Sequence, residues 1–324
     1  MMNVTVITSD SKVWNFAEVC TTIATARATK QDLVLNLNNE GPDFETLGLV
    51  ELIGNYPTKV VNIRNSVQRS INNIVFDIKS NNWMNNTIDS LAEVVVNKNI
   101  KHPLGLFIGR SNPIRLLLSS YVHSISTAHQ TFRYDSTQEF HKNNLGVEQL
   151  VEKYGLEHLD NVVKLLYNSP LVVNDDLYLA GASGDLVKVH TKNAYLLHRE
   201  YKHFLVELVC ETYYNGNTFF PTEKTWRPII LETPFIVQGP QWYLHRLRDL
   251  GFQTFDRWWD EGYGEDPADH QPVEIVKVID FLAKKDIAEL NAMYKEMKPV
   301  LAQNRKRFME LTSKDFEIFE NDRY

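Results

Sequence analysis

Short apolar runs alternate with longer amphipathic segments along most of this chain. Such alternation predicts strands separated by helices, and therefore parallel sheets with helices on both faces. We expect strands at residues 4–8, 32–37, 60–63, 74–78, 104–108, 204–210 and 234–239. We expect helices at 13–27, 44–53, 114–123, 145–170, 242–250, 273–283 and 287–309, and a short one from Glu223. The pattern is that of an α/β protein.

The length of the chain, 324 residues, predicts two domains, since one hydrophobic core rarely grows so large. We place the first at residues 1–170 and the second at 171–324, with the C-terminal helices able to pack back on the first. Two open sheets that face each other form a cleft at the carboxyl ends of their strands, where such folds bind ligands.

The composition of the chain limits where the protein acts and how it can contact nucleic acid. No segment approaches the roughly 20 apolar residues of a membrane span, and the first residues lack the layout of a signal peptide. Cys20 and Cys210 lie far apart within apolar patterns, which indicates reduced core residues and a cytoplasmic protein. With a net charge of -7, any contact with nucleic acid must use a local basic patch.

Several common site motifs are missing from the sequence. It has no Gly-x-Gly-x-x-Gly after the first strand, no P-loop, no Gly-x-Ser-x-Gly and no His-Glu-x-x-His. The histidine spacings fit no zinc layout, so we assign no metal and no resident cofactor.

The most informative segment is 222–227, where Thr222, Glu223, Lys224, Thr225 and Arg227 surround the start of the short helix. Free N–H groups and the helix dipole attract anions there, and a lysine and an arginine strengthen that attraction. A carboxylate beside them can bind sugar hydroxyls, so the cluster suits a nucleotide diphosphate. The alternative is a capping Thr222 with solvated charges.

Two further loops follow predicted strands. Glu40 and Asp43 flank a Gly-Pro turn, and either carboxylate can act as a general base; the alternative is an ordinary turn with Asp43 as a helix cap. Arg110 and Arg115 follow Gly109 at a strand-to-helix junction, where they can bracket a phosphate or simply face solvent.

An ordered series of motifs in this sequence resembles a known family. Thr-Glu-Lys-Thr at 222–225, Pro-Phe-Ile at 234–236, Gly-Phe-Gln-Thr-Phe at 251–255 and Asp-Glu-Gly-Tyr at 260–263 resemble the C-terminal half of viral and phage GT-B glycosyltransferases. The turn at 39–42 fits the same set. Thr-Glu-Lys alone is also similar to the motif of α-1,3-fucosyltransferases.

The resemblance implies a nucleotide-sugar transferase with two Rossmann-like domains and the donor, a UDP-sugar in our interpretation, held by the second. By analogy Glu223 holds the ribose and Lys224 the diphosphate. The chain departs from the fucosyltransferase motif at 225–227, which leaves the sugar open. Retaining GT-B enzymes often have two glutamates separated by seven residues, whereas eight separate Glu223 from Glu232, which favours inversion.

The mechanism that we expect follows from charge. Negative charge grows on the leaving diphosphate, and cationic side chains can stabilise it without a metal. We assign this role to Lys224, Arg227, Arg110 and Arg115, and the deprotonation of the acceptor hydroxyl to Asp43 or Glu40.

Basic residues interleaved with aromatic ones suit contacts with a phosphate backbone and stacking on bases. The basic residues that we select for nucleic-acid binding are Lys188, Lys192, Arg199, Lys202, Arg246 and Arg248. Because phages glycosylate 5-hydroxymethylcytosine with GT-B enzymes, double-stranded DNA bearing that base is the acceptor we expect. The alternatives are a glycan or protein acceptor, a non-catalytic nucleotide- or nucleic-acid-binding protein, and, for these residues, core aromatics beside solvated cations.

Overall fold

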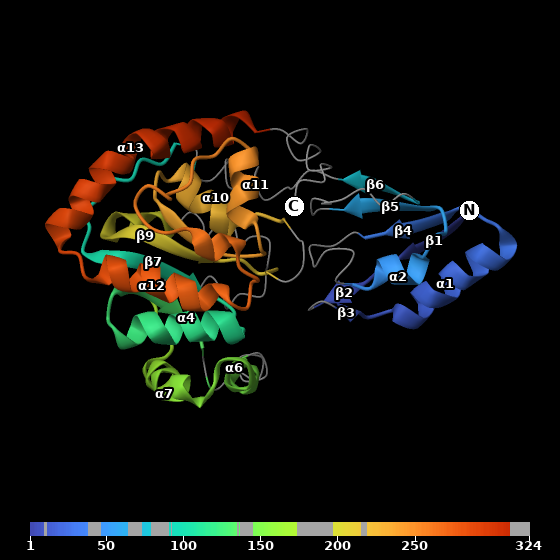
Figure 1. Cartoon of the computed structure of the whole chain (residues 1–324), viewed down its shortest axis with the longest axis horizontal. Coiled ribbons are helices and arrows are strands. Elements are labelled where there is room, and N and C mark those ends of the chain that lie inside the picture. Colours follow the sequence, from blue (N-terminus) through green and yellow to red (C-terminus); the bar gives the residue numbers. More distant parts are fainter. Residues whose placement is uncertain are drawn as a thin grey trace.

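The structure is a computed structural model, and it confirms an α/β protein with two four-stranded parallel sheets (Figure 1). Each sheet has its own cluster of buried apolar side chains. The residues that the structure describes are 1–9, 12–37, 47–63, 73–78, 91, 93–134, 136, 145–173, 197–214 and 219–311.

The smaller body contains the N-terminal sheet, whose strands follow one another in chain order. Its strands are β1 (Met2–Thr5), β4 (Leu33–Asn36), β5 (Thr58–Ile63) and β6 (Ile74–Ile78), its helices are α1 (Phe16–Thr29) and α2 (Leu49–Ile53), and β2 (Thr8–Ser9) and β3 (Lys12–Val13) form a short antiparallel pair. Helix α1 buries Val19, Ile23 and Ala26. Their spacing of four and three residues places them on one helix face, which packs into the core of this sheet.

The larger body is built on a second sheet with the strand order β10-β9-β7-β8. Its strands are β7 (His102–Ile108), β8 (Ala128–Phe132), β9 (Phe204–Cys210) and β10 (Phe235–Gln238). Every residue of β9 is buried, as expected for a central strand covered on both faces.

Helices cover both faces of this larger sheet (Figure 1). On one face lie α4 (Pro113–Ser124) and α12 (Gln271–Ala283), with α6 (Val147–Tyr154) and α7 (Leu159–Asn168) packed against α4, and on the other face lie α10 (Glu223–Ile230) and α13 (Ile287–Glu310). Helix α11 (Tyr243–Asp249) and the 3-10 helices η1 (Leu156–His158), η2 (His198–His203) and η3 (Gly262–Glu265) complete the described elements.

The direction of chain winding reverses in the middle of the larger sheet. From β7 the chain passes through α4 to β8 on one side, and then crosses to β9 on the other side of β7. The carboxyl ends of β7 and β9 therefore flank a topological switch point, which is where open α/β sheets bind ligands.

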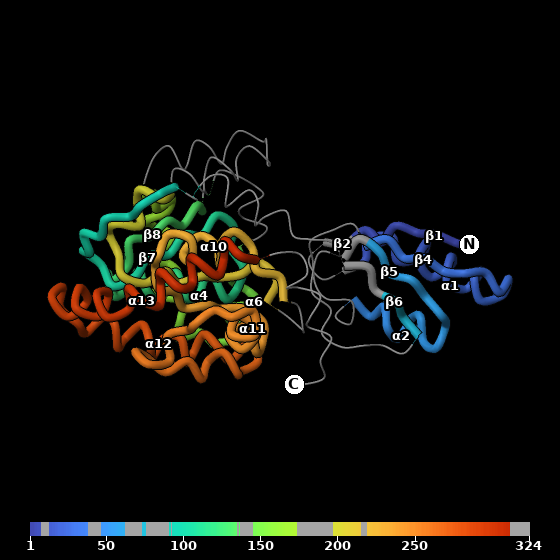
Figure 2. Tube along the Cα trace, turned by 90° about the horizontal axis from the view of Figure 1, so that it is seen from above, coloured from blue at the N-terminus to red at the C-terminus, as the bar shows by residue number. Residues whose placement is uncertain are grey.

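The change from one core to the other lies earlier than the boundary at residue 170 that the sequence pattern suggested. Ile74 belongs to the smaller core and Leu91 to the larger one. The physical reason is strand pairing: β7 bonds directly to β9, so residues before 170 share a sheet with residues beyond it. Figure 2 shows the N-terminal strands and α1 in a body apart from β7 and β8.

Most predicted elements are present, although the helix expected at 145–170 is divided into α6, η1 and α7. Strand β8 was not predicted, because Ala-His-Gln-Thr-Phe carries little apolar signal. Helix α13 packs on α10 and β9, and α12 packs on α4 and β7, which lie within residues 1–170. No helix in the described ranges has the length and apolar character needed to cross a membrane.

Candidate anion-binding site at the switch point

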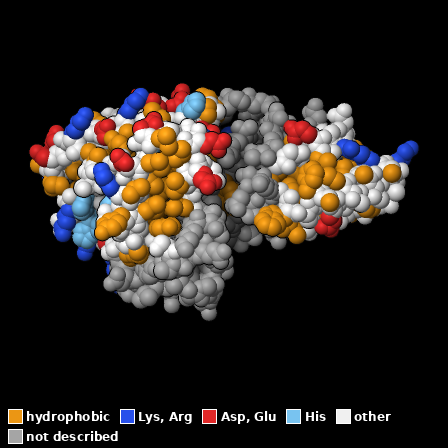
Figure 3. Space-filling view, turned by 90° about the horizontal axis from the view of Figure 1, so that it is seen from below, with side chains coloured by type: hydrophobic (Ala, Val, Ile, Leu, Met, Phe, Trp, Pro, Cys, Tyr) orange, Lys and Arg blue, Asp and Glu red, His pale blue; other side chains and the backbone are white. Residues whose placement is uncertain are grey.

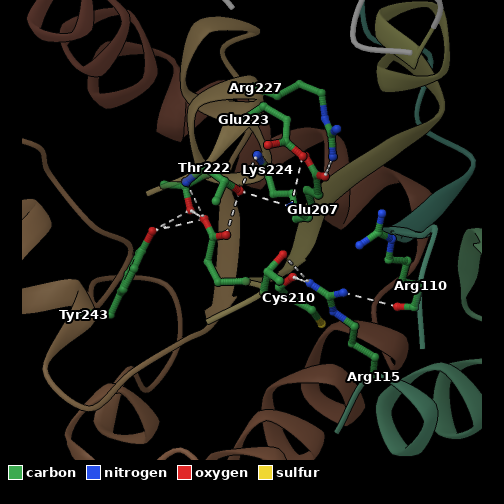
Figure 4. Close-up of polar contacts among 12 residues, drawn as sticks. Arg110, Arg115, Glu207, Cys210, Thr222, Glu223, Lys224, Arg227 and Tyr243 are labelled. Carbon is green, nitrogen blue, oxygen red and sulfur yellow. Dashed lines mark hydrogen bonds and ion pairs between the residues drawn. The ribbon is translucent and has the colours of Figure 1, made fainter. Parts of the chain in front are cut away.

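The predicted phosphate-binding residues come from three elements that meet at the carboxyl end of the larger sheet (Figure 4). Arg110 follows β7, and Arg115 lies in the first turn of α4. Thr222 and Lys224 lie at the start of α10, which follows β9 along the chain. The structure therefore brings together residues that are more than 100 positions apart in the sequence.

Helix α10 begins at a capped N-terminus. The side chain of Thr222 accepts a hydrogen bond from the backbone N–H of Lys224 at 3.3 Å. This is the N-cap contact of the alternative interpretation of the sequence, and cationic side chains lie beside it, so the cap does not exclude a candidate anion site. The free N–H groups of a helix start and its dipole supply positive potential to this end of the sheet.

A buried carboxylate that the sequence analysis did not select holds this helix start in place. Glu211, directly after β9, accepts from the backbone N–H of Thr222 at 3.0 Å and from its hydroxyl at 2.7 Å. Its Oε1 also accepts from the hydroxyls of Thr225, at 2.7 Å, and Tyr243, at 3.2 Å. A carboxylate with four donors is well satisfied in the interior, which makes Glu211 a positioning residue.

Lys224 is held by the same array. Its Nζ donates to Thr222 Oγ1 at 3.2 Å and forms an ion pair with Glu223 Oε1 at 2.9 Å. Because Thr222 donates its own hydroxyl proton to Glu211, its oxygen lone pairs are available to the ammonium group. A series of hydrogen bonds thus runs from Glu211 through Thr222 to Lys224 and fixes the lysine near the helix start.

Arg115 brings a buried positive charge to the same place. The cap of α4 fixes it, since Asn112 accepts from the Arg115 backbone N–H at 2.8 Å. Its guanidinium donates to the carbonyl of Cys210 at 2.7 Å and to Thr212 Oγ1 at 3.2 Å. Its Nε is buried and has no hydrogen-bond partner among the described residues. Burial lowers the pKa of Arg115, and Glu211 and Glu223 counteract that effect.

Arg110 complements Arg115. Its backbone carbonyl accepts from Arg115 Nη1 at 3.2 Å, which ties the two residues together. Arg110 is exposed. Figure 4 shows its guanidinium directed toward the group of residues that contains Cys210 and Lys224. The site thus combines one buried and one exposed guanidinium with one partly buried ammonium group.

Arg227, which we had placed at the phosphate, occupies a different position. It lies on the buried face of α10, where it forms an ion pair with Glu207 and a hydrogen bond with the Tyr201 hydroxyl. Burial alone would lower its pKa, but Glu207 and Tyr201 raise it. The guanidinium therefore stays charged and anchors α10 to β9, a role set by its place one turn inside the helix.

Glu232, which the sequence analysis compared with the second glutamate of retaining GT-B enzymes, lies far from Glu223. Glu223 begins α10, whereas Glu232 follows its end and pairs with Arg305 at 3.5 Å. A helix of eight residues is about 12 Å long, so these carboxylates do not meet around one sugar.

The expected nucleic-acid residues divide into three groups. Arg248 donates to Thr254 at 2.8 Å and pairs with Glu261 at 2.7 Å, and Arg246 is buried with its guanidinium 5.8 Å from the Phe219 ring centroid. Both therefore support the fold.

Arg199 and Lys202 are exposed, but they precede β9, at the amino end of the sheet. Seven strand residues span about 20 Å, which separates them from the switch point. Lys188, Lys192 and the two candidate bases Glu40 and Asp43 lie outside the described residues, and their roles stay predictions.

Comparison with known proteins adds no assignment: no protein-family model, curated protein or solved structure matches this chain.

Proposed function

We propose that this protein is a GT-B-type glycosyltransferase that binds the diphosphate of a nucleotide sugar at the switch point of its larger sheet. One observation carries the proposal. The capped start of α10, the ammonium of Lys224 and the guanidiniums of Arg110 and Arg115 converge at the carboxyl ends of β7 and β9. Phosphate oxygens are the ligands that such a combination of helix start and cations suits best.

The proposed chemistry uses these groups in distinct ways. When the bond between the anomeric carbon and the diphosphate breaks, both bonding electrons go to the leaving oxygen. Lys224 and Arg110 face that growing negative charge, and Arg115 supplies a fixed positive charge that costs no reorganisation during the reaction. We assign Glu223, which pairs with Lys224, to the sugar hydroxyls of the donor, and the proton of the acceptor to Asp43 or Glu40.

For the acceptor we propose a hydroxyl group, with 5-hydroxymethylcytosine in DNA as the first substrate to test. The support for this choice is the resemblance to phage enzymes. The positions of the described arginines and lysines do not contribute, because Arg246 and Arg248 stabilise the fold and Lys202 lies about 20 Å from the donor site.

The test begins with binding. Thermal unfolding is followed with UDP, GDP and their sugar conjugates, because a ligand at 100 times its Kd stabilises by about 2.7 kcal/mol. The Lys224→Ala and Arg110→Ala variants should each weaken binding of the diphosphate by about 1.5–3 kcal/mol, or roughly 10- to 150-fold in Kd. Lys295→Ala, which removes an exposed lysine of α13, is the matched control.

Transfer is then measured with radiolabelled donor and hydroxymethylated duplex DNA, a glycan mixture or protein as acceptor. Binding without hydrolysis or transfer of any donor would make the protein a nucleotide-binding one and would refute the enzymatic part. If no nucleotide binds to the wild-type protein, or if Lys224→Ala and Lys295→Ala behave alike, the site assignment itself is wrong.

A further inference from the structure

A second cluster of chemically reactive side chains lies at the amino end of the larger sheet, opposite the switch point. His102 begins β7, His129 is the second residue of β8, and His203 directly precedes β9. Because β9, β7 and β8 are neighbours in the sheet, the three imidazoles come together from distant parts of the chain.

The rings form a row with His129 in the middle. The ring centroids of His102 and His129 are 5.6 Å apart and nearly parallel, and those of His129 and His203 are 5.2 Å apart. The first pair of rings is stacked, whereas the second pair is tilted by 58°. Among the described residues, no group of three or more potential metal ligands is arranged to hold an ion.

Cations border the histidine row. Lys101 and Lys202 are exposed, and each is the sequence neighbour of one of the histidines. The backbone N–H of Lys101 donates to the carbonyl of His203 at 2.8 Å, which joins the strand β7 and η2 sides of the cluster. Arg199 of η2 is also exposed. Figure 3 shows histidine, lysine and arginine side chains gathered at one end of the larger body.

Among the described residues, Glu200 of η2 is the acidic side chain that acts on His203 against these cations. Its Oε2 lies 2.8 Å from His129 Nε2. Lys101 and Lys202 together outweigh the one carboxylate, so an excess of positive charge is present before any imidazole is protonated. Burial lowers the pKa of His102 and His203, and His129 and the adjacent lysines lower it further. The local field is thus positive, and His203 Nδ1 is buried without a partner in the described part of the chain.

We propose that His102, His129, His203, Lys101 and Lys202 form a second anion site, which binds a phosphate group and binds it more tightly at acidic than at neutral pH. A bound phosphate would offset the repulsion among the imidazoles and favour their protonated forms. By linkage, each proton taken up with the ligand raises affinity up to tenfold per pH unit across the histidine titration range. The phosphate can be a free ion or belong to the backbone of a polynucleotide.

The experiment follows the imidazole signals of the full-length protein by NMR during titration with inorganic sulfate at pH 6.0 and pH 7.5, because sulfate stands in for the phosphate dianion and keeps two negative charges at both pH values. We expect the signals of all three histidines to shift, with a Kd about tenfold lower at pH 6.0. The same titration with a duplex oligonucleotide separates the two sources. A lower Kd for the duplex that rises with salt indicates a polynucleotide, and equal or weaker binding indicates the free ion.

Surface variants keep the test independent of folding. Lys101→Gln combined with Lys202→Gln should weaken sulfate binding at pH 6.0 by about tenfold or more, because two charge-assisted contacts are lost. The matched control, Lys284→Gln with Lys295→Gln, removes two exposed lysines elsewhere and should leave Kd unchanged. Unshifted histidine signals, a Kd independent of pH, or equal effects of the two pairs would each overturn the proposal.

Discussion

Glu207 and Glu211 lie four residues apart along β9 and its extension, and both carboxylates bind helix α10. Glu207 pairs with Arg227, and Glu211 accepts hydrogen bonds from Thr222 and Thr225. Alternate residues of a strand share a face, so both carboxylates point to the same side of the sheet. Directional polar contacts therefore fix both the start and the middle of α10, which gives Lys224 a defined position at the switch point.

The first prediction concerns the series of hydrogen bonds that runs from Glu211 through Thr222 to Lys224. Glu211→Gln places an amide donor beside Thr222 Oγ1, which then loses capacity to accept from Lys224 Nζ. Thr222→Val removes that acceptor directly. We expect each variant to weaken nucleoside diphosphate binding by about 1 kcal/mol, or roughly fivefold in Kd, measured by isothermal titration calorimetry.

The double variant separates positioning from general destabilisation. If Glu211 acts through Thr222, the losses in binding are not additive, and the double variant binds about as well as Thr222→Val alone. Additive losses would show that Glu211 does not act on Lys224 through Thr222. Wild-type binding is measured first, so that failure of the nucleotide proposal is distinguished from failure of this one.

The second prediction concerns the buried pair of Glu207 and Arg227. Arg227→Met leaves the carboxylate of Glu207 buried beside Tyr201 without its cation. Breaking such a pair from one side should cost about 3–5 kcal/mol in the free energy of unfolding, measured with urea. The double variant Glu207→Leu with Arg227→Met leaves no unpaired charge from the pair and should be less destabilised than Arg227→Met. A loss under 1 kcal/mol for the single variant would show that the pair is not buried in solution.

The residues of the candidate site were selected from local patterns in the sequence, because such patterns reflect interactions between residues close along the chain. Thr222 as N-cap and Lys224 beside it follow from the order of residue types at a helix start, and the structure confirms the cap. The alternation of apolar runs likewise predicted β7, β9 and β10. Strand β8 was missed because its pairing with β7, rather than its own residues, makes it a strand.

Long-range relationships lie beyond such patterns. Arg227 and Lys224 look equivalent in the sequence, yet the helix directs one toward β9 and its buried Glu207 and leaves the other beside Thr222. Glu211 had a signal that we did not use: a carboxylate directly after a wholly apolar strand end and close before the Thr-Glu-Lys segment. The predicted domain boundary at residue 170 differs from the observed change of core, because only strand pairing shows that β7 belongs to the same sheet as β9.

The third prediction concerns thiol reactivity. Cys210 is buried at the end of β9, and burial raises its pKa to about 12. Since the thiolate is the reactive form, Cys210 should resist alkylation in the native protein at pH 8. Cys20 is partly exposed. We expect Cys20→Ser to abolish rapid labelling, as measured by mass spectrometry, whereas labelling in urea still occurs at Cys210. Rapid native labelling of the Cys20→Ser variant would contradict the buried position of Cys210.

The fourth prediction concerns Lys98, whose ammonium group lies at the amino end of β9 and beside the ring of Tyr294 in α13. Its Nζ donates to the carbonyls of Tyr201, at 2.8 Å, and Phe204, at 3.0 Å, and to Thr233 Oγ1 at 2.9 Å. Burial lowers the pKa of Lys98 to about 7, although Glu207 opposes the change. In the unfolded chain a lysine titrates near pH 10.4. Between these two values the unfolded state binds more protons, so the free energy of unfolding must rise with pH.

Between pH 7 and pH 9, Lys98 should raise the free energy of unfolding by about 2 kcal/mol. The rise is about 1.36 kcal/mol per pH unit once the lysine of the folded protein is neutral. Urea unfolding at both pH values measures it as the difference between the wild-type protein and Lys98→Met. Other titrating groups contribute to both proteins and cancel in that difference. Stability of Lys98→Met should therefore rise less, or fall more, from pH 7 to pH 9 than that of the wild type. Equal changes in the two proteins would show that Lys98 keeps its proton in the folded state, with the carbonyls and Glu207 outweighing the effect of burial.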